Sequence, residues 1–149
     1  MTSFINKFHR KSLLMLFILF IGGQVNAEQV SVVVNINNNE EITPEMIKQI
    51  YTDKRNFWES GKEILLFELP VKDRGREVFS KTLLNKSAIS SQSDWSNRFV
   101  KNTIKNKVKI KPEKLVAKFV SINQSSIGYI STEMAKQQKN IKIIMTIDK

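Results

Sequence analysis

A short basic turn offers the strongest anion-binding chemistry in this sequence. It reads Lys72, Asp73, Arg74, Gly75 and Arg76 and stands at the start of a predicted helix. Unpaired backbone N–H groups and the helix dipole favour an anion at a helix start, and an arginine fork can bind phosphate or carboxylate through two hydrogen bonds. A glycine here would let the backbone come close to a ligand. The turn therefore predicts an oxyanion site formed by Asp73, Arg74, Gly75 and Arg76.

Each candidate site residue also has a purely structural interpretation. Asp73 can cap the helix and pair with Arg76, which would fill the site with the protein's own carboxylate. Trp58, the remaining candidate, can edge a ligand cleft because an indole suits a place that is apolar on one side and wet on the other. More often such a residue plugs the end of the sheet. The residues alone leave both alternatives open.

The usual groups of catalysis and transition-metal binding are scarce. The chain has no cysteine, and its one histidine, His9, lies in the segment expected to be removed on secretion. Without histidine or cysteine, a protein lacks the common proton shuttle, the thiol nucleophile and the commonest transition-metal ligands. The acidic residues are scattered, and no pair is marked by its setting. We therefore predict no catalytic residue, no metal site and no cofactor, and a binding protein rather than an enzyme.

The first 27 residues have the layout of a secretory signal peptide. Lys7, Arg10 and Lys11 precede an apolar run over residues 13–21, and small residues ending at Ala27 suit cleavage. The run is only half of the roughly 20 apolar residues that a membrane-spanning helix needs. We expect a signal peptide over 1–27, a single mature domain over 28–149, a periplasmic location and no stable membrane insertion after cleavage.

The mature chain stays basic. The formal charge of the whole chain is +10, and removal of Lys7, Arg10 and Lys11 leaves 21 basic residues against 14 acidic ones, a charge of +7. This balance favours anionic partners, although a solvated lysine-rich surface also explains it. The lysines of residues 101–111 suit either a solvated face or a basic patch for a membrane or partner. No aromatic residues interleave with them, so we predict no nucleic-acid binding by base stacking.

Strands and helices must alternate to position these groups. Apolar, β-branched runs predict strands over 30–35, 64–69, 127–130 and 141–147. Capping residues and helical spacing predict helices over 44–51 and 73–84, a third that opens at Ser87 or Ser90, and a fourth from Pro112. Residues 101–111 are ambiguous. This alternation predicts an α/β sheet covered by helices on both faces, in one domain.

Three segments, in this order, carry a resemblance to a known family. They read IKQIYTDKRNFWESGKEI, LPVKDRGREVFSKTLL and SSIGYI. Together they resemble the phosphate-binding protein of the phosphate ABC transporter, a type 2 periplasmic binding protein, and in particular a short branch that retains one lobe. The resemblance covers roughly residues 30–130, and its matched positions are Asn35, Ile50, Tyr51, Lys54, Trp58, Phe79, Trp95, Phe99, Ile127, Gly128 and Tyr129.

The resemblance implies a fold and a ligand, and the departures from it leave a second function open. It implies a single lobe with a mixed sheet of about four to five strands and a small oxyanion such as phosphate as ligand. Asp73, Arg74 and Gly75, however, stand where the family has a Ser-Gly-Thr turn, VKNTIKNKVKIK replaces a glycine-rich stretch, and the second lobe is missing. The alternative is an interaction module that presents its surface to an envelope protein, such as a sensor, porin or transporter, without binding a small ligand.

Overall fold

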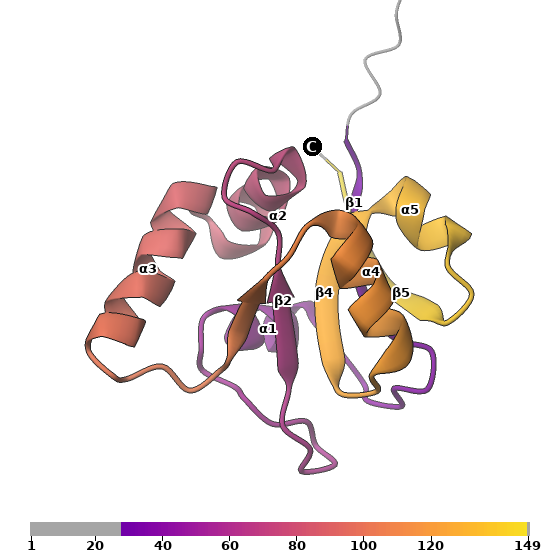
Figure 1. Ribbon diagram of the computed structural model, residues 1–149, viewed down its shortest axis with the longest axis horizontal. Helices are drawn as coiled ribbons and strands as arrows, with labels where there is room; N and C mark the ends of the chain where they lie inside the picture. The colour runs from indigo at the N-terminus through magenta and orange to yellow at the C-terminus, as the bar shows by residue number, and fades with distance from the viewer. Residues whose placement is uncertain (1–27, 149) are drawn as a thin grey trace, which may run out of the picture.

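Five strands form one mixed sheet in the computed structural model, which describes residues 28–148. Their order across the sheet is β3-β2-β4-β1-β5 (Figure 1). Three strands, β2, β3 and β4, run parallel to one another, and β1 runs antiparallel to both β4 and β5. The strands are β1 (Val30–Asn35), β2 (Leu65–Glu68), β3 (Val108–Ile110), β4 (Ser126–Ser131) and β5 (Ile141–Ile147).

Strand β1 has partners on both sides, which explains its unbroken β-branched sequence. Every residue of VSVVVN is buried, because neighbouring strands cover its edges and helices cover both of its faces. Val32 lies opposite Tyr129 of β4, and Val33 lies opposite Gly128. Interior strands of this kind are apolar on both faces. The outermost strands of the sheet are β3 and β5.

Helices pack on both faces of the sheet. Helices α1 and α2 lie behind it in the view of Figure 1 and α4 lies in front. Side chains of Thr43, Asp73, Ser87 and Ser131 cap α1, α2, α3 and α5, and each accepts a hydrogen bond from a backbone N–H of its own helix. The helices are α1 (Pro44–Tyr51), α2 (Arg74–Leu84), α3 (Ala88–Val100), α4 (Glu113–Ile122) and α5 (Thr132–Gln137).

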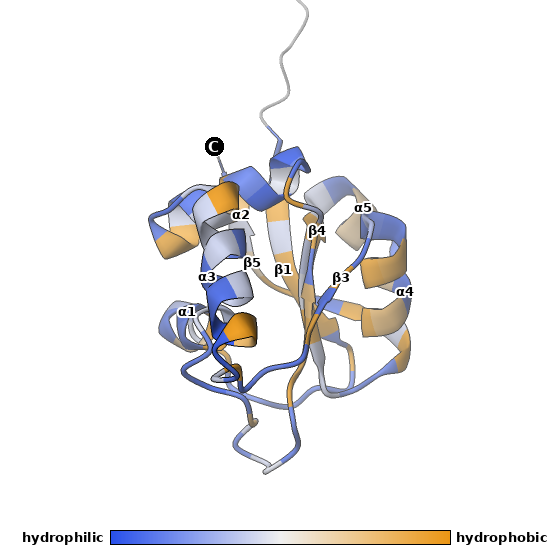
Figure 2. Ribbon diagram, turned by 60° about the vertical axis from the view of Figure 1, so that its left-hand side comes forward, coloured by the Kyte–Doolittle hydropathy of each residue, from blue (hydrophilic) through white to orange (hydrophobic). Residues whose placement is uncertain are grey.

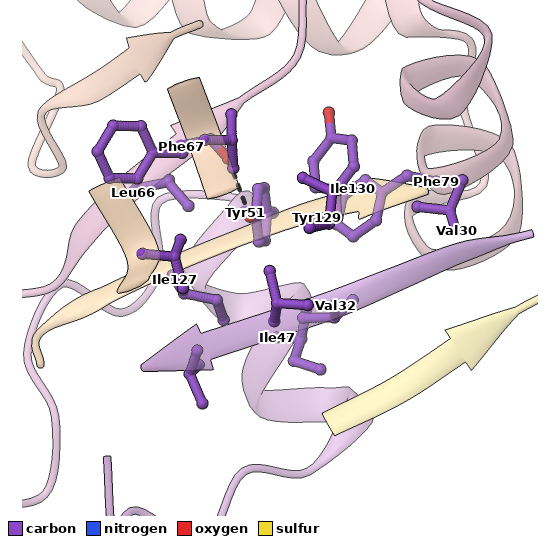
Figure 3. Packing of buried hydrophobic residues seen from close by; sticks show 14 of the residues in the cluster. Val30, Val32, Ile47, Tyr51, Leu66, Phe67, Phe79, Ile127, Tyr129 and Ile130 are labelled. Carbon is purple, nitrogen blue, oxygen red and sulfur yellow. Dashed lines mark hydrogen bonds between the residues drawn. The ribbon is translucent and has the colours of Figure 1, made fainter. Parts of the chain in front are cut away.

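Aromatic side chains form the centre of the core between α1, α2 and the sheet. The rings of Phe79 and Tyr129 stack with centroids 3.9 Å apart, and the ring of Tyr51 meets Phe79 edge-on (Figure 3). The Tyr51 hydroxyl donates a hydrogen bond to the Phe67 carbonyl at 3.0 Å. Buried tyrosines usually satisfy their hydroxyls in this way. The core thus joins α1 and α2 to β2 and β4.

The structure confirms most of the predicted elements and corrects some details. The strands and the first four helices lie where the sequence predicts them, and Ser87, rather than Ser90, caps α3. The ambiguous segment holds β3, and the helix α5 was not predicted. Thr82 and Leu115 are exposed, because the buried stripes of α2 and α4 are turned toward Ser80 and Ala117.

Two predictions concern the ends of the chain and membranes. The predicted signal peptide lies outside the described residues. Among residues 28–148, no helix is long and apolar enough to cross a membrane.

Candidate functional site

The carboxyl ends of the three parallel strands lie along one side of the sheet, here termed its carboxyl edge. Each of these strands leads directly into a helix: β2 into α2, β3 into α4 and β4 into α5. Since β1 runs antiparallel to β4, its first residues lie at the same edge, where Val30 pairs with Ser131. Open α/β sheets bind their ligands in the crevice at this edge. The fold therefore favours a ligand site at this edge.

A cavity of about 790 Å³ lies at this edge. It is lined by the first residues of α2 and α4, by α5 and the serine that caps it, and by the residues that precede β1. Two cations and three carboxylates face it, so a bound anion would meet both attraction and repulsion. The lining residues are Glu28, Gln29, Arg74, Glu113, Ser131, Thr132, Glu133 and Lys136.

Arg74 is the member of the predicted basic turn that faces this cavity. Its side chain is 77% exposed, and its Nε lies 3.5 Å from Glu28 Oε2. An exposed ion pair of this length contributes little stability, at most about 1 kcal/mol. A ligand anion that offers two acceptor oxygens can therefore displace Glu28 from the guanidinium.

Asp73 and Gly75 form the helix start itself. Asp73 Oδ1 accepts a hydrogen bond from the Gly75 N–H at 2.8 Å, so Asp73 caps the helix as its structural interpretation predicts. A Cβ on Gly75 would come within 3.2 Å of Leu69 Cδ1 and 3.1 Å of Asp73 Oδ1. The glycine therefore serves the close packing of α2 on the sheet, and its N–H is already engaged.

Arg76 points away from the cavity into the core. Its side chain is fully buried, its Nη1 donates to the Leu69 carbonyl at 2.9 Å, and its Nε lies 3.4 Å from Glu68 Oε2. The carboxylate of Glu68 also accepts hydrogen bonds from the Tyr129 hydroxyl and, at 3.3 Å, from Trp95 Nε1. Arg76 thus anchors α2 to β2, whereas the pairing with Asp73 that the sequence suggested is absent from the ion pairs of the described residues.

Burial dominates the ionisation of this internal cluster. It raises the pKa of Glu68 above the ordinary glutamate value, although Arg76 and the hydrogen bonds from Tyr129 and Trp95 pull the pKa back down. Burial and the nearby Glu68 likewise raise the pKa of the Tyr129 hydroxyl. The cluster is closed to solvent and forms a structural support beneath the cavity edge.

Trp58 lies at the opposite end of the sheet. Its Nε1 donates a hydrogen bond at 2.9 Å to the carbonyl of Ser125, which directly precedes β4. The indole is buried, yet it lines a separate polar cavity of about 530 Å³ with Glu40, Lys62 and Gln124 among its other residues. The structure therefore does not bring Trp58 together with Asp73, Arg74, Gly75 and Arg76.

Several cavity residues escaped the sequence analysis. Glu113 and Ser131 are brought together by the parallel pairing of the strands, and the Ser131 N–H donates to Glu113 Oε1. Lys136 belongs to α5, which was not predicted. Their signals were only helix-capping residues, which mark a helix start but not its neighbours in space. Within residues 28–148 no cluster of acidic side chains is arranged to hold a metal ion.

Solved structures share this fold. An ABC-type phosphate transport receptor from Vibrio cholerae matches with a TM-score of 0.60 and 16% identity over 79% of this chain and 46% of the receptor. A phosphate ABC transporter substrate-binding protein from Clostridium perfringens, solved with bound phosphate, matches with a TM-score of 0.51 and 16% identity over 82% of this chain and 56% of that protein. No protein-family model matches the sequence, and no curated protein matches it significantly.

These neighbours establish the fold. This chain spans about half the length of the neighbours that it matches. The resemblance seen in the sequence is therefore confirmed at the level of the fold: the chain is an α/β protein with a five-stranded mixed sheet that corresponds to a single lobe of a periplasmic binding protein.

Proposed function

We propose that this protein is a periplasmic solute-binding-like protein whose single lobe binds a small oxyanion such as phosphate. The observation that carries the proposal is the position of Arg74, exposed on the first turn of α2 and lining the cavity at the carboxyl ends of the parallel strands. A guanidinium that can donate two hydrogen bonds suits a phosphate-like anion. The fold neighbours, a phosphate transport receptor and a protein solved with phosphate, support the same ligand class.

In this proposal the residues of the basic turn have different roles. Arg74 contacts the anion, with Lys136 as a second cation at the cavity. Asp73 and Gly75 hold the turn in shape, and Arg76 fixes α2 from below through Glu68 and Leu69. Trp58 packs the far end of the sheet. Glu28 forms an ion pair with the Arg74 guanidinium when no ligand is bound.

A thermal-shift experiment tests this assignment. The melting temperature of the wild-type protein is measured with phosphate, sulfate and chloride at equal ionic strength, and we expect phosphate or sulfate to raise it above the chloride value. Arg74→Ala should abolish the rise, and Glu28→Gln should enlarge it because a competing carboxylate is removed. Lys72→Ala is the matched control, since Lys72 is an exposed cation of the same turn that does not line the cavity. A rise that persists in Arg74→Ala would refute the site.

A second candidate function is an interaction module for an envelope protein. It is favoured by an exposed apolar surface at the end of α3, where Phe99 and Val100 are 73% and 83% exposed. Large exposed apolar patches mark interaction sites more often than single exposed residues do. Recovery of one defined envelope protein with the wild-type chain, in low salt and in high salt, tests this candidate. If no envelope protein is recovered in either low or high salt, this result counts against the interaction module.

A further inference from the structure

An open apolar groove runs between α3 and the edge strand β3. It has a volume of about 250 Å³, and Trp95 lies at its base while Phe99, Val100, Ile104, Val108 and Ile110 line its walls. Figure 2 shows hydrophobic residues at the carboxyl end of α3, on the side of the molecule where β3 runs. The groove shares no residue with the Arg74 cavity. The oxyanion proposal leaves this groove without a role.

The segment that carries β3 is strongly basic. Residues 101–111 carry five lysines and no acidic residue. None of these lysines lines the groove itself; Lys109 and Lys111 line a separate cavity with Phe67 and Phe119. None of these lysines takes part in the ion pairs found among the described residues. Such an uncompensated positive segment beside the groove favours a partner with carboxylates. The lysines are Lys101, Lys105, Lys107, Lys109 and Lys111.

One side of β3 is open to another strand. In the described sheet β3 pairs only with β2, and the lysines alternate with Val108 and Ile110 along it. Edge strands present unpaired backbone groups that can accept an added extended segment, with alternate side chains giving specificity. A segment that alternates acidic and apolar residues complements both the lysines and the groove.

The segment that carries the lysines is held in place before any partner binds. Asp53 accepts hydrogen bonds from the backbone N–H groups of Lys105 at 2.9 Å and Asn106 at 2.8 Å. The side-chain amide of Asn106 donates to the carbonyls of Arg55 at 2.9 Å and Ile50 at 3.3 Å. Because the segment is preorganised, a partner loses less free energy in ordering it.

We infer that the groove between α3 and β3 binds an acidic, extended segment of a partner protein, which adds a strand to β3. Its apolar side chains enter the groove beside Phe99 and Val108, and its carboxylates meet Lys107 and Lys109. A concave groove beside an open strand edge fits a peptide better than it fits a flat lipid surface. This inference deepens the second candidate function and rests on it, whereas the oxyanion site is independent.

Binding of designed peptides tests the inference. The probe is a fluorescent peptide of about ten residues with alternating glutamate and valine, a length typical of a strand. Fluorescence anisotropy with protein purified from cells that express the full chain should show binding that weakens as salt rises, because the lysine contacts are exposed. A peptide with lysine in place of glutamate should not bind. A peptide with proline in place of valine, which cannot pair as a strand, should bind at least about tenfold more weakly.

Matched variants locate the binding surface. Phe99→Ser, and the double variant Lys107→Glu with Lys109→Glu, should each weaken binding of the acidic peptide about tenfold or more. Ile122→Ser controls for loss of an exposed apolar residue, since Ile122 is 69% exposed at the end of α4. Lys114→Glu with Lys118→Glu controls for charge reversal on the exposed face of α4. Both controls should bind like the wild type.

Three results with peptides, variants or vesicles would overturn the inference. The first is equal binding of the acidic and the lysine-bearing peptides, and the second is unchanged binding by Phe99→Ser. The third is binding to phosphatidylserine vesicles, lost in the same variants, without binding of the acidic peptide, which would assign the surface to lipid. If an envelope partner is still recovered with the Phe99→Ser and charge-reversed variants, the module function survives and the groove assignment does not.

Discussion

Two arginines that are separated only by Gly75 have different surroundings and are assigned different roles. Arg74 and Arg76 lie in the same turn, but Arg74 lines an open cavity and Arg76 is buried against Glu68. A buried ion pair loses hydration energy that its attraction only partly restores, so its value depends on the hydrogen bonds around it. The Glu68 carboxylate has these from Tyr129 and Trp95.

The raised pKa of Glu68 predicts a pH dependence of stability. Between the ordinary value of 4.5 and the raised pKa, the folded state keeps a proton that the unfolded state has released. The free energy of unfolding therefore falls as pH rises through this window. Glu68→Gln should remove this fall, as measured by urea unfolding at a series of pH values. Glu63→Gln, at an exposed glutamate, should keep it. The same slope in Glu68→Gln and the wild type would contradict the prediction.

Removal of the buried guanidinium should be costly. Arg76→Met leaves the Glu68 carboxylate without its counter-ion, and we expect a loss of about 3–5 kcal/mol in the free energy of unfolding near neutral pH. Adding Glu68→Gln should restore part of the loss, because the unpaired charge is then gone. Urea unfolding of the two single variants and the double variant measures the coupling. Additive losses would show that the two side chains do not act as a pair.

At the level of elements, the contact between α4 and β4 depends on a glycine. A Cβ on Gly128 would lie 2.6 Å from Val116 Cγ1 and 3.4 Å from Phe67 Cβ. Gly128 sits on the face of β4 that α4 covers, so the helix approaches the strand closely only because no side chain intervenes. Gly61, in contrast, has open space around it and a φ of +80°, so its requirement is the backbone conformation.

The two glycines should respond differently to compensation. Gly128→Ala should destabilise the protein by about 1–3 kcal/mol through overpacking, and adding Val116→Ala should recover part of this loss. Gly61→Ala should cost about 1 kcal/mol through backbone strain, and Val116→Ala should give it no relief. Thermal unfolding of the single and double variants makes the comparison. If Val116→Ala deepens the Gly128→Ala defect, the packing explanation fails.

The sequence predicted where each helix and strand lies along the chain better than it predicted which elements lie side by side in space. Alternating apolar runs and caps located β1, β2, β4, β5 and the first four helices, because these signals are local. Helix α5 has only six residues, too short for a clear periodicity, and β3 was hidden by its lysines. The basic turn was recognisable as a possible anion site. The direction in which the Arg76 side chain points and the distance between Trp58 and this turn, however, depend on the order of the strands in the sheet. Local patterns do not encode that order.

At the level of the whole molecule, a single lobe would leave the proposed oxyanion partly exposed. The chain corresponds to about half of each structural neighbour, and small-molecule sites normally bury most of the ligand surface. The cavity beside Arg74 is open, and three glutamates face it together with the two cations. We therefore expect the proposed oxyanion to bind weakly.

Even weak binding of phosphate should stabilise the fold by a measurable amount. With a dissociation constant of about 1 mM, phosphate at about 10 mM should stabilise the fold by about 1.4 kcal/mol. If the single lobe is the binding unit, the stabilisation should not change when the protein concentration is varied, and sedimentation should show no association on adding phosphate. Stabilisation that grows with protein concentration would instead show that two copies build the site.

The link between β3 and α4 touches both proposed binding surfaces. Ile110 lines the groove, Glu113 lines the cavity three residues later, and the Lys111 N–H between them donates to the Glu68 carbonyl at 2.9 Å. A shift of this short connection would therefore move residues of both the groove and the cavity. Thermodynamic reciprocity then requires that the factor by which the acidic peptide changes the dissociation constant of phosphate equals the factor by which phosphate changes that of the peptide.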